Sequence, residues 1–246
     1  MSLFENGQSL IVPILISLFL VPIETRCQNK NIHKLKKRSN LSFHIPRGVL
    51  LNELTWAYLE AEHDSCIYIA RKAISYTMLH EKEDEQLIAR IQLAEAYRTR
   101  NQLKAASTEL QEAQREFGQL AINKKYLPRL LLVKGRIAYD QSDLITAEKC
   151  YREGYSISSM FTHVLLPEFC IGLADIERDK GRIENERKYL LKAHSLARKQ
   201  KKIFLELISL NDLGMNAAQS NLFERAQGYF DQSLRLAQKQ QNLKAQ

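Results

Sequence analysis

A helix-pair pattern that recurs about every 40 residues limits the folds open to this chain more than any other feature. Small or short side chains mark one helix-packing position in each copy: Thr55, Ala94, Gly135, Ala174 and Gly214. Short polar breaks, such as Arg100-Asn101 and Lys180-Gly181, separate two apolar-periodic segments within a copy. A single helix pair cannot bury its own apolar face, so the pairs must stack on one another. The pattern therefore predicts an all-α chain whose core grows by repetition.

Two further positions follow the same period. The first holds Cys66, Ala106, Ala147, Glu186 and Ala226, and the second, four residues later, holds Ala70, Leu110, Tyr151, Leu190 and Phe230. Glu186 interrupts the series of small residues, and a buried carboxylate needs a partner. We expect Arg182 or Lys188 to pair with it, unless the helix is rotated. We also expect the fourth copy to be the least regular.

This series of small and bulky positions resembles the tetratricopeptide repeat (TPR). The resemblance implies a right-handed α-solenoid of about five helix-turn-helix repeats over residues 48–246, with repeats near 48–80, 87–124, 128–163, 167–202 and 207–242. The copies lie 39 to 41 residues apart, against 34 in an ordinary TPR. The five to seven additional residues are close to two helical turns. We therefore expect about one additional turn in each helix.

Long-helix TPR arrays are similar to the sensor regions of bacterial signalling proteins. The first copy, from Leu51 to Ile74, looks like the opening repeat of the exported sensor region in such proteins from Bacteroidetes. The resemblance implies a non-enzymatic protein or peptide interaction module that is the sensing or scaffolding part of a bacterial signalling system. An intracellular peptide-responsive TPR regulator and a structural assembly scaffold are the alternatives.

Residues 1–25 form a hydrophobic segment that we interpret as a signal or anchor. Its apolar stretch, Leu10–Ile23, has 14 residues. As a helix it spans about 21 Å, against roughly 30 Å for the hydrocarbon core of a membrane, which suits a secretory signal better than a spanning helix. The flanks of this stretch lack the basic start and the small-residue cleavage site of such a signal. We expect an exported, periplasmic or membrane-anchored protein with membrane association through residues 10–23, and a cytoplasmic protein is the alternative.

Residues 26–47 form a basic linker that accounts for most of the net charge. The whole chain carries +8, whereas the part from Val49 onward has 29 basic and 26 acidic residues, a balance of +3. The repeat region therefore lacks the excess of positive charge that a nucleic-acid-binding surface needs. We expect no nucleic-acid partner.

Motifs that carry chemistry are missing from the sequence. It contains no glycine-rich phosphate loop, no nucleophile elbow and no His-Glu-x-x-His motif. The six histidines include no pair four residues apart, and the four cysteines form no Cys-x-x-Cys spacing. We therefore expect no catalytic residue, no metal site, no cofactor and no enzymatic activity, with Cys66 and Cys150 as buried thiols.

The TPR resemblance also places a binding surface. In the family, ligands lie in a concave groove lined by the first helix of each pair, at repeat positions that correspond here to Glu95, Arg98, Arg136, Tyr139, Asp175, Arg178 and Met215. Mixed charge with an aromatic residue suits an extended peptide or a partner helix. The clamp with which some TPR proteins read chaperone C-termini uses Lys at the fifth and Asn at the ninth repeat position, and no copy here has either residue at that position.

The fifth copy has no added polar helix to cover its apolar face. Phe223, Tyr229, Phe230 and Leu234 form this face, and solenoids commonly cover their last repeat with a polar cap. The polar end of the last helix is one candidate for covering this face. A homodimer through the C-terminal repeat and contact with a further C-terminal part of the protein are the other two.

Overall fold

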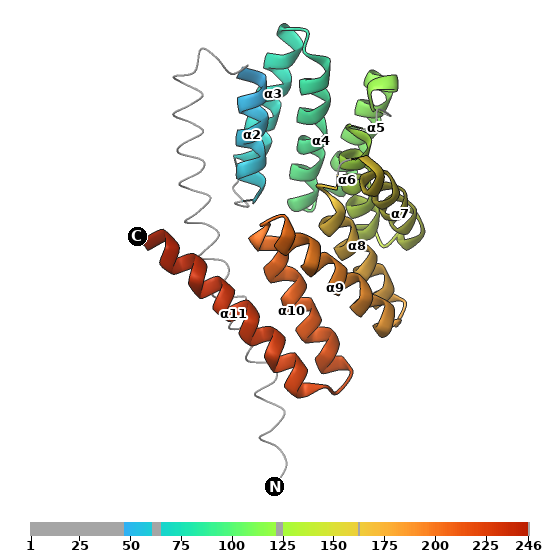
Figure 1. Cartoon of the computed structure of the whole chain (residues 1–246). Helices are drawn as coiled ribbons and strands as arrows, with labels where there is room; N and C mark the ends of the chain where they lie inside the picture. The colour runs from blue at the N-terminus through green and yellow to red at the C-terminus, as the bar shows by residue number, and fades with distance from the viewer. Residues whose placement is uncertain (1–46, 61–64, 122–124, 162, 246) are drawn as a thin grey trace. The chain divides into compact units, whose positions relative to one another are not determined.

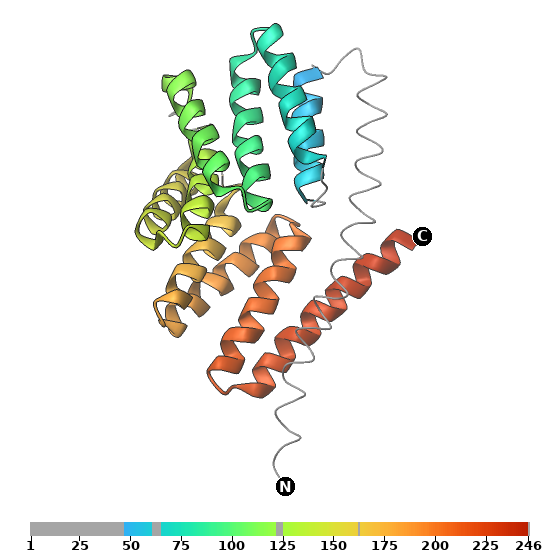
Figure 2. The ribbon, with the colours of Figure 1, turned by 180° about the vertical axis from the view of Figure 1, so that it is seen from behind.

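The computed structural model describes residues 47–60, 65–121, 125–161 and 163–245 (Figures 1 and 2). This part of the chain consists of ten helices and contains no strand. The predicted all-α architecture is confirmed. The hydrophobic segment at 1–25 and the basic linker at 26–47, except for Arg47, lie outside the described residues.

The helices follow one another as five pairs joined by short turns. They are α2 (Arg47–Glu60) with α3 (Cys66–Leu79), α4 (Glu83–Thr99) with α5 (Leu103–Ala121), α6 (Leu127–Asp140) with α7 (Leu144–Phe161), α8 (Leu166–Asp179) with α9 (Ile183–Lys199), and α10 (Ile203–Gln219) with α11 (Phe223–Ala245). The first helices of neighbouring pairs also pack together, namely α2 with α4, α4 with α6, and α8 with α10. The described residues divide into two compact units, 47–157 and 158–245, and each is treated by itself.

The additional residues of the long repeat are distributed unevenly. Helices α4 and α10 have 17 residues, whereas α6 and α8 have 14. Both shorter helices carry a proline as their second residue, Pro128 or Pro167. Proline lacks the backbone N–H and clashes with the carbonyl group four residues earlier, so it is tolerated only in the first turn and limits the extension of either helix towards its N-terminus. The second helices α5, α7 and α9, with 19, 18 and 17 residues, take up the length instead.

Four turns within pairs share one backbone geometry. Each contains a residue with positive φ: Asn101 (57°), Ser142 (63°), Gly181 (69°) and Asn221 (57°). The next residue donates its backbone N–H to a carbonyl five residues back, as Gln102 does to Tyr97 at 2.9 Å. These bonds form the Schellman motif, which satisfies the free carbonyl groups at a helix end. Because the turn is repeated, the second helix of each of these pairs leaves the first in the same direction.

The small position on the first helix is matched to the bulk of the side chain that packs on it. A Cβ placed on Gly135 would lie 2.5 Å from the ring of Tyr151, and one placed on Gly214 would lie 2.4 Å from the ring of Phe230. Where the first helix carries alanine, the second carries leucine, as in the pair Ala94 and Leu110 of one buried cluster. The combined volume of the two side chains therefore stays nearly constant, which keeps the distance between the two helix axes similar from pair to pair.

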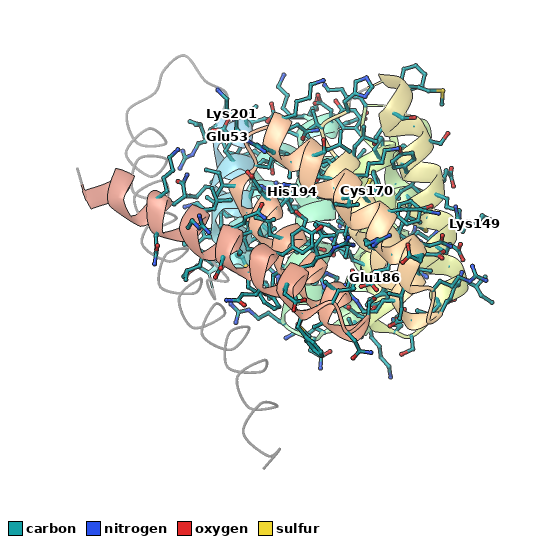
Figure 3. The ribbon with its side chains drawn as sticks, turned by 60° about the horizontal axis from the view of Figure 1, so that its bottom comes forward. Glu53, Lys149, Cys170, Glu186, His194 and Lys201 are labelled. Carbon is teal, nitrogen blue, oxygen red and sulfur yellow. The ribbon has the colours of Figure 1, made fainter. Side chains whose placement is uncertain are left out.

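Glu186, labelled in Figure 3, is buried with 1% of its side chain exposed. Its partners differ from the expected ones. Nε of Arg178 donates to its Oε1 at 2.6 Å, and Nδ2 of Asn216 donates to its Oε2 at 2.8 Å. The expectation that Arg182 or Lys188 pairs with Glu186 is wrong. Arg178 of α8 and Asn216 of α10 pack against α9 and bind both carboxylate oxygens of Glu186 instead. The fourth pair is also not the least regular, since non-helical backbone lies instead at Gly118 in α5.

The Gly135–Tyr151 contact generates the first prediction. Gly135→Ala should destabilise the 47–157 unit by about 1–3 kcal/mol, because the ring of Tyr151 cannot retreat within a packed core. The double variant Gly135→Ala/Tyr151→Leu recreates the Ala94 and Leu110 combination, so we expect it to lose less stability than the two single changes added together. Urea unfolding of the four proteins measures this coupling.

The control is Gly228→Ala on α11, where an added Cβ would meet no atom within 4 Å. It reports the gain in helix propensity alone, about 1 kcal/mol. Additive effects of Gly135→Ala and Tyr151→Leu would contradict the size-matching argument.

Candidate functional site

The seven predicted site residues fall into two groups, one in each unit. Four belong to the 47–157 unit: Glu95 and Arg98 on α4, and Arg136 and Tyr139 on α6. Three belong to the 158–245 unit: Asp175 and Arg178 on α8, and Met215 on α10. All seven lie on first helices of their pairs.

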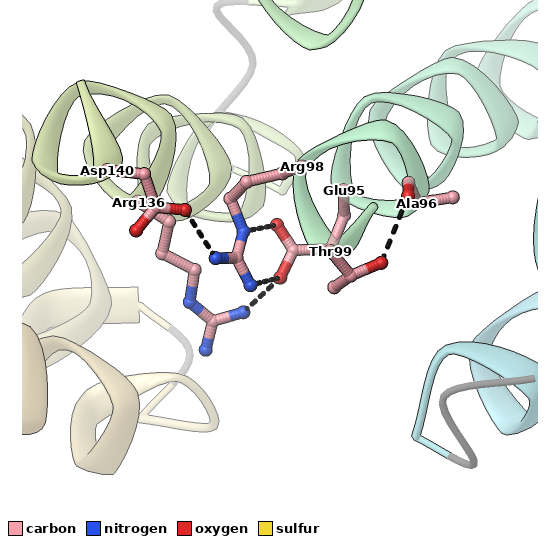
Figure 4. A network of polar contacts seen from close by, with 6 residues as sticks. All are labelled: Glu95, Ala96, Arg98, Thr99, Arg136 and Asp140. Atoms are coloured by element: carbon pink, nitrogen blue, oxygen red, sulfur yellow. Dashed lines mark hydrogen bonds and ion pairs between the residues drawn. The ribbon is translucent and has the colours of Figure 1, made fainter. Parts of the chain in front are cut away.

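In the 47–157 unit the buried carboxylate of Glu95 organises a network of ion pairs (Figure 4). Arg98 donates to it twice, through Nε at 2.9 Å and through Nη2 at 3.1 Å. Arg136 donates from the neighbouring pair through Nη1 at 2.8 Å. Asp140, which sequence reasoning did not include, accepts from Nη1 of Arg98 at 2.7 Å. The network thereby joins α4 to α6.

Electrostatics keep this network charged. Burial by itself would raise the pKa of Glu95, but the guanidinium groups of Arg136 and Arg98 outweigh burial and hold that pKa below its ordinary value. Burial acts in the opposite sense on Arg98, yet Glu95 and Asp140 raise the pKa of Arg98 above its ordinary value. Two guanidinium groups therefore face two carboxylates in a balanced cluster.

The two arginines differ in how much of their bonding capacity is used. All three guanidinium nitrogens of Arg98 donate hydrogen bonds to Glu95 or Asp140. Arg136 spends only Nη1, and its Nε and Nη2 make no hydrogen bond or ion pair among the described residues. Its side chain is 29% exposed. Arg98 is therefore a structural residue, whereas Arg136 has two donors to offer to a partner.

In the 158–245 unit a single guanidinium meets three carboxylates. Besides Glu186, Arg178 pairs with Asp175 at 2.8 Å through Nη1 and lies 3.8 Å from Asp212 through Nη2. Asp212 belongs to α10, so the cluster joins three helices. Sequence reasoning missed Asp212 and did not connect Glu186 with Arg178, since the only available signal was the alignment of successive first helices.

The excess of negative charge shifts two of these carboxyl groups. Burial raises the pKa of Asp175 to about 7; Arg178 opposes this shift, and Asp212 and Asp179 add to it. Burial raises the pKa of Asp212 to about 6 against the effect of Arg178, and Glu186 adds to the rise. One guanidinium cannot compensate three negative charges in a partly desolvated site.

Met215, the seventh predicted residue, belongs to neither ion-pair network and lies on an exposed part of α10, one turn after Asp212. Its side chain is 38% exposed and makes no polar contact. Tyr139 is half-buried on α6. The five charged residues thus belong to two ion-pair networks, whereas Met215 presents an exposed apolar side chain.

Other kinds of site have no candidates within the described ranges. No group of three or more histidine, cysteine or acidic residues there could hold a metal ion. Cys66, Cys150 and Cys170 are free and buried, and burial raises the pKa of each thiol, that of Cys170 to about 12. No described helix is long and apolar enough to cross a membrane.

Solved structures share this fold. The TPR-like repeats of a kinesin light chain-like protein from Podosopora anserina match with a TM-score of 0.53 at 14% identity, over 81% of this chain and 100% of that chain. BtubC (BKLC) from P. vanneervenii matches with a TM-score of 0.56 at 12% identity, over 88% of this chain and 90% of that chain. No protein-family model and no curated protein matches. The chain therefore has the TPR-like α-solenoid fold that its repeats predicted.

The acidic cluster generates a prediction about pH. Asp175 and Asp212 bind protons more tightly in the folded state than in the unfolded chain, whose aspartates titrate near 3.9. The folded state therefore holds more protons between roughly pH 4 and 7, and its stability falls as the pH rises through that range. Asp175→Asn should stabilise the 158–245 unit at pH 8 by about 1–3 kcal/mol and should have little effect at pH 4.

Urea unfolding of the full chain at several pH values measures this difference. Asp231→Asn on α11 is the control, because Asp231 makes no ion pair with any described residue. A gain from Asp175→Asn that is the same at pH 4 and pH 8 would show that Asp175 is ionised throughout and would contradict the prediction.

Proposed function

We propose that this protein is a non-enzymatic interaction module that binds a protein or peptide partner along the first helices of its pairs. The observation that carries the proposal is Arg136, whose side chain is 29% exposed and bonds the buried carboxylate of Glu95 through Nη1 alone. Glu95 fixes the position of the guanidinium before any partner arrives, so little side-chain entropy is lost on binding. An arginine held in this way is typical of residues that dominate binding at interfaces.

The TPR-like fold supports a role in protein interaction, since such repeats are generally interaction modules and typically non-catalytic. We further propose a sensing or scaffolding role in a bacterial signalling system. This part rests on the long repeat and on the likeness of residues 51–74 to the opening repeat of exported sensors. Export or anchoring through residues 10–23 belongs to the same proposal.

Self-association through the C-terminal pair is a second candidate interaction. Phe223 at the start of α11 is 56% exposed, which leaves an apolar group in solvent. Phe230 is buried against Gly214 in its own pair, so the face offered to a second copy is narrower than the sequence indicated. Light scattering of Phe223→Ser against the unchanged protein tests this candidate.

The main proposal predicts that Arg136→Glu abolishes partner capture. The reversed charge would repel Glu95 and any carboxylate or carbonyl group that Arg136 would otherwise bind. Quantitative pull-downs from the source cells, with the unchanged protein and the variant as bait, measure the loss, which we expect to be at least tenfold. Arg152→Glu is the matched control, because Arg152 is an exposed arginine on the second helix α7.

A milder variant separates binding from folding. Arg136→Gln leaves both bonds from Arg98 to Glu95 in place but removes one of the two cations that stabilise this buried carboxylate, so its thermal unfolding temperature should fall by less than that of Arg136→Glu. Its partner capture should nevertheless fall. Equal capture by the unchanged protein, Arg136→Gln and Arg136→Glu would remove this surface from the proposal.

A further inference from the structure

Helix α10 presents a strip of three apolar side chains on one exposed face, interrupted by the half-buried Asn211. Phe204, Ile208 and Met215 are separated by four and seven residues, a spacing that places all three on the same side of a helix. Phe204 is 50% exposed and Met215 is 38% exposed, while Ile208 is half-buried. The helices that pack on α10 in this unit, α8, α9 and α11, therefore leave the strip in contact with solvent.

The acidic cluster borders this strip. Asp212 lies on α10 between Ile208 and Met215, four residues after the first and three before the second. Asp175 of α8 adjoins it through their shared partner Arg178. Three carboxylates, including that of Glu186, meet this one guanidinium. The strip is thus flanked by uncompensated negative charge.

Nearby positive charge does not cancel this excess. Lys202 precedes α10, but its ammonium group is bound by the carboxylate of Glu168 at 2.7 Å and by the carbonyl of Val164. Arg178 is the only cation that the described contacts place against Asp175 and Asp212. A further cation is therefore what the site lacks.

We propose that this α8–α10 face, formed by Phe204, Ile208, Met215, Asp175 and Asp212, binds a partner segment that combines apolar side chains with lysine or arginine. The inference rests on the proposed function and specifies the partner's chemistry at a second surface. An apolar side chain of the segment would cover Phe204 and Met215, whose thioether adapts to varied shapes. A lysine or arginine would supply the missing charge beside Asp175 and Asp212.

Other chemistries fit this face less well. An acidic segment would add negative charge to a cluster that already has too much. A neutral apolar segment would cover the strip but would also remove water from Asp175 and Asp212 without replacing its interactions, which costs free energy. A segment with apolar and positively charged side chains can cover the apolar strip and also pair with Asp175 and Asp212.

The same chemistry couples binding to protons. A bound cation favours the ionised forms of Asp175 and Asp212, so binding of a basic segment releases protons that these groups hold near neutral pH. Affinity should therefore rise between pH 5 and pH 8. The charges that face the two aspartates are Arg178 and Asp179 on α8, and Glu186 on α9.

The experiment measures the binding of labelled peptides to the full chain by fluorescence anisotropy. The probe alternates leucine with lysine, and two matched peptides of the same length replace lysine with glutamine or glutamate. We expect the lysine peptide to bind at least tenfold more tightly than either of the others. Asp212→Asn should weaken its binding about tenfold, and Met215→Ser should weaken it as well, whereas the control Asp231→Asn should leave it unchanged.

Two results would overturn the inference. Equal affinity for the lysine and glutamine peptides would remove the role of charge, and an unchanged affinity in Asp212→Asn would remove this face. An Arg136→Gln arm distinguishes the two proposals, because the α8–α10 face does not include Arg136. If Arg136→Gln alone weakens the lysine peptide, the present inference fails while the proposed function stands.

Discussion

The close approach of the two helices in each pair is the constraint on which the rest of this structure depends. A glycine or alanine on the first helix receives a matching ring or leucine from the second, as Gly135 receives Tyr151. This contact fixes the thickness of a pair, and the repeated turn fixes its direction. Within each unit the first helices of successive pairs then lie side by side, which is the condition for Glu95 to meet Arg136 or for Asp175 to meet Asp212.

Equivalent repeat positions acquire opposite electrostatic character in this arrangement. Arg98 and Arg178 occupy the same position in the second and fourth copies, and each pairs with an acid three residues earlier. The next copy decides the outcome. It contributes Arg136 to the first network and Asp212 to the second, so one cluster is balanced and the other is acidic. Repetition supplies the scaffold, and single substitutions within it determine the chemistry of each surface.

The sequence predicted the structural features that recur with the repeat spacing. The helix pairs, their packing positions and the starts of α6 and α8 all follow from small residues and prolines at regular intervals. It did not predict contacts between copies. Closeness in sequence favours Arg182 or Lys188 as the partner of Glu186, whereas Asn216 lies 30 residues away and is brought near by the stacking of α10. Pairing across copies depends on helix crossing and side-chain length, which a one-dimensional pattern does not contain.

The two clusters also give the two units opposite linkage to protons. The pKa of Glu95 is lowered in the folded state, so its contribution to stability is present at neutral pH and is lost as the pH falls through that value. The pKa values of Asp175 and Asp212 are raised, so the stability linked to them is present in acid and is lost as the pH rises towards 7. Acid therefore weakens the 47–157 unit through Glu95, while a rise from acid to neutral pH weakens the 158–245 unit through its aspartates. A basic partner at the second cluster would offset this weakening at neutral pH, because it replaces the lost protons with a fixed positive charge.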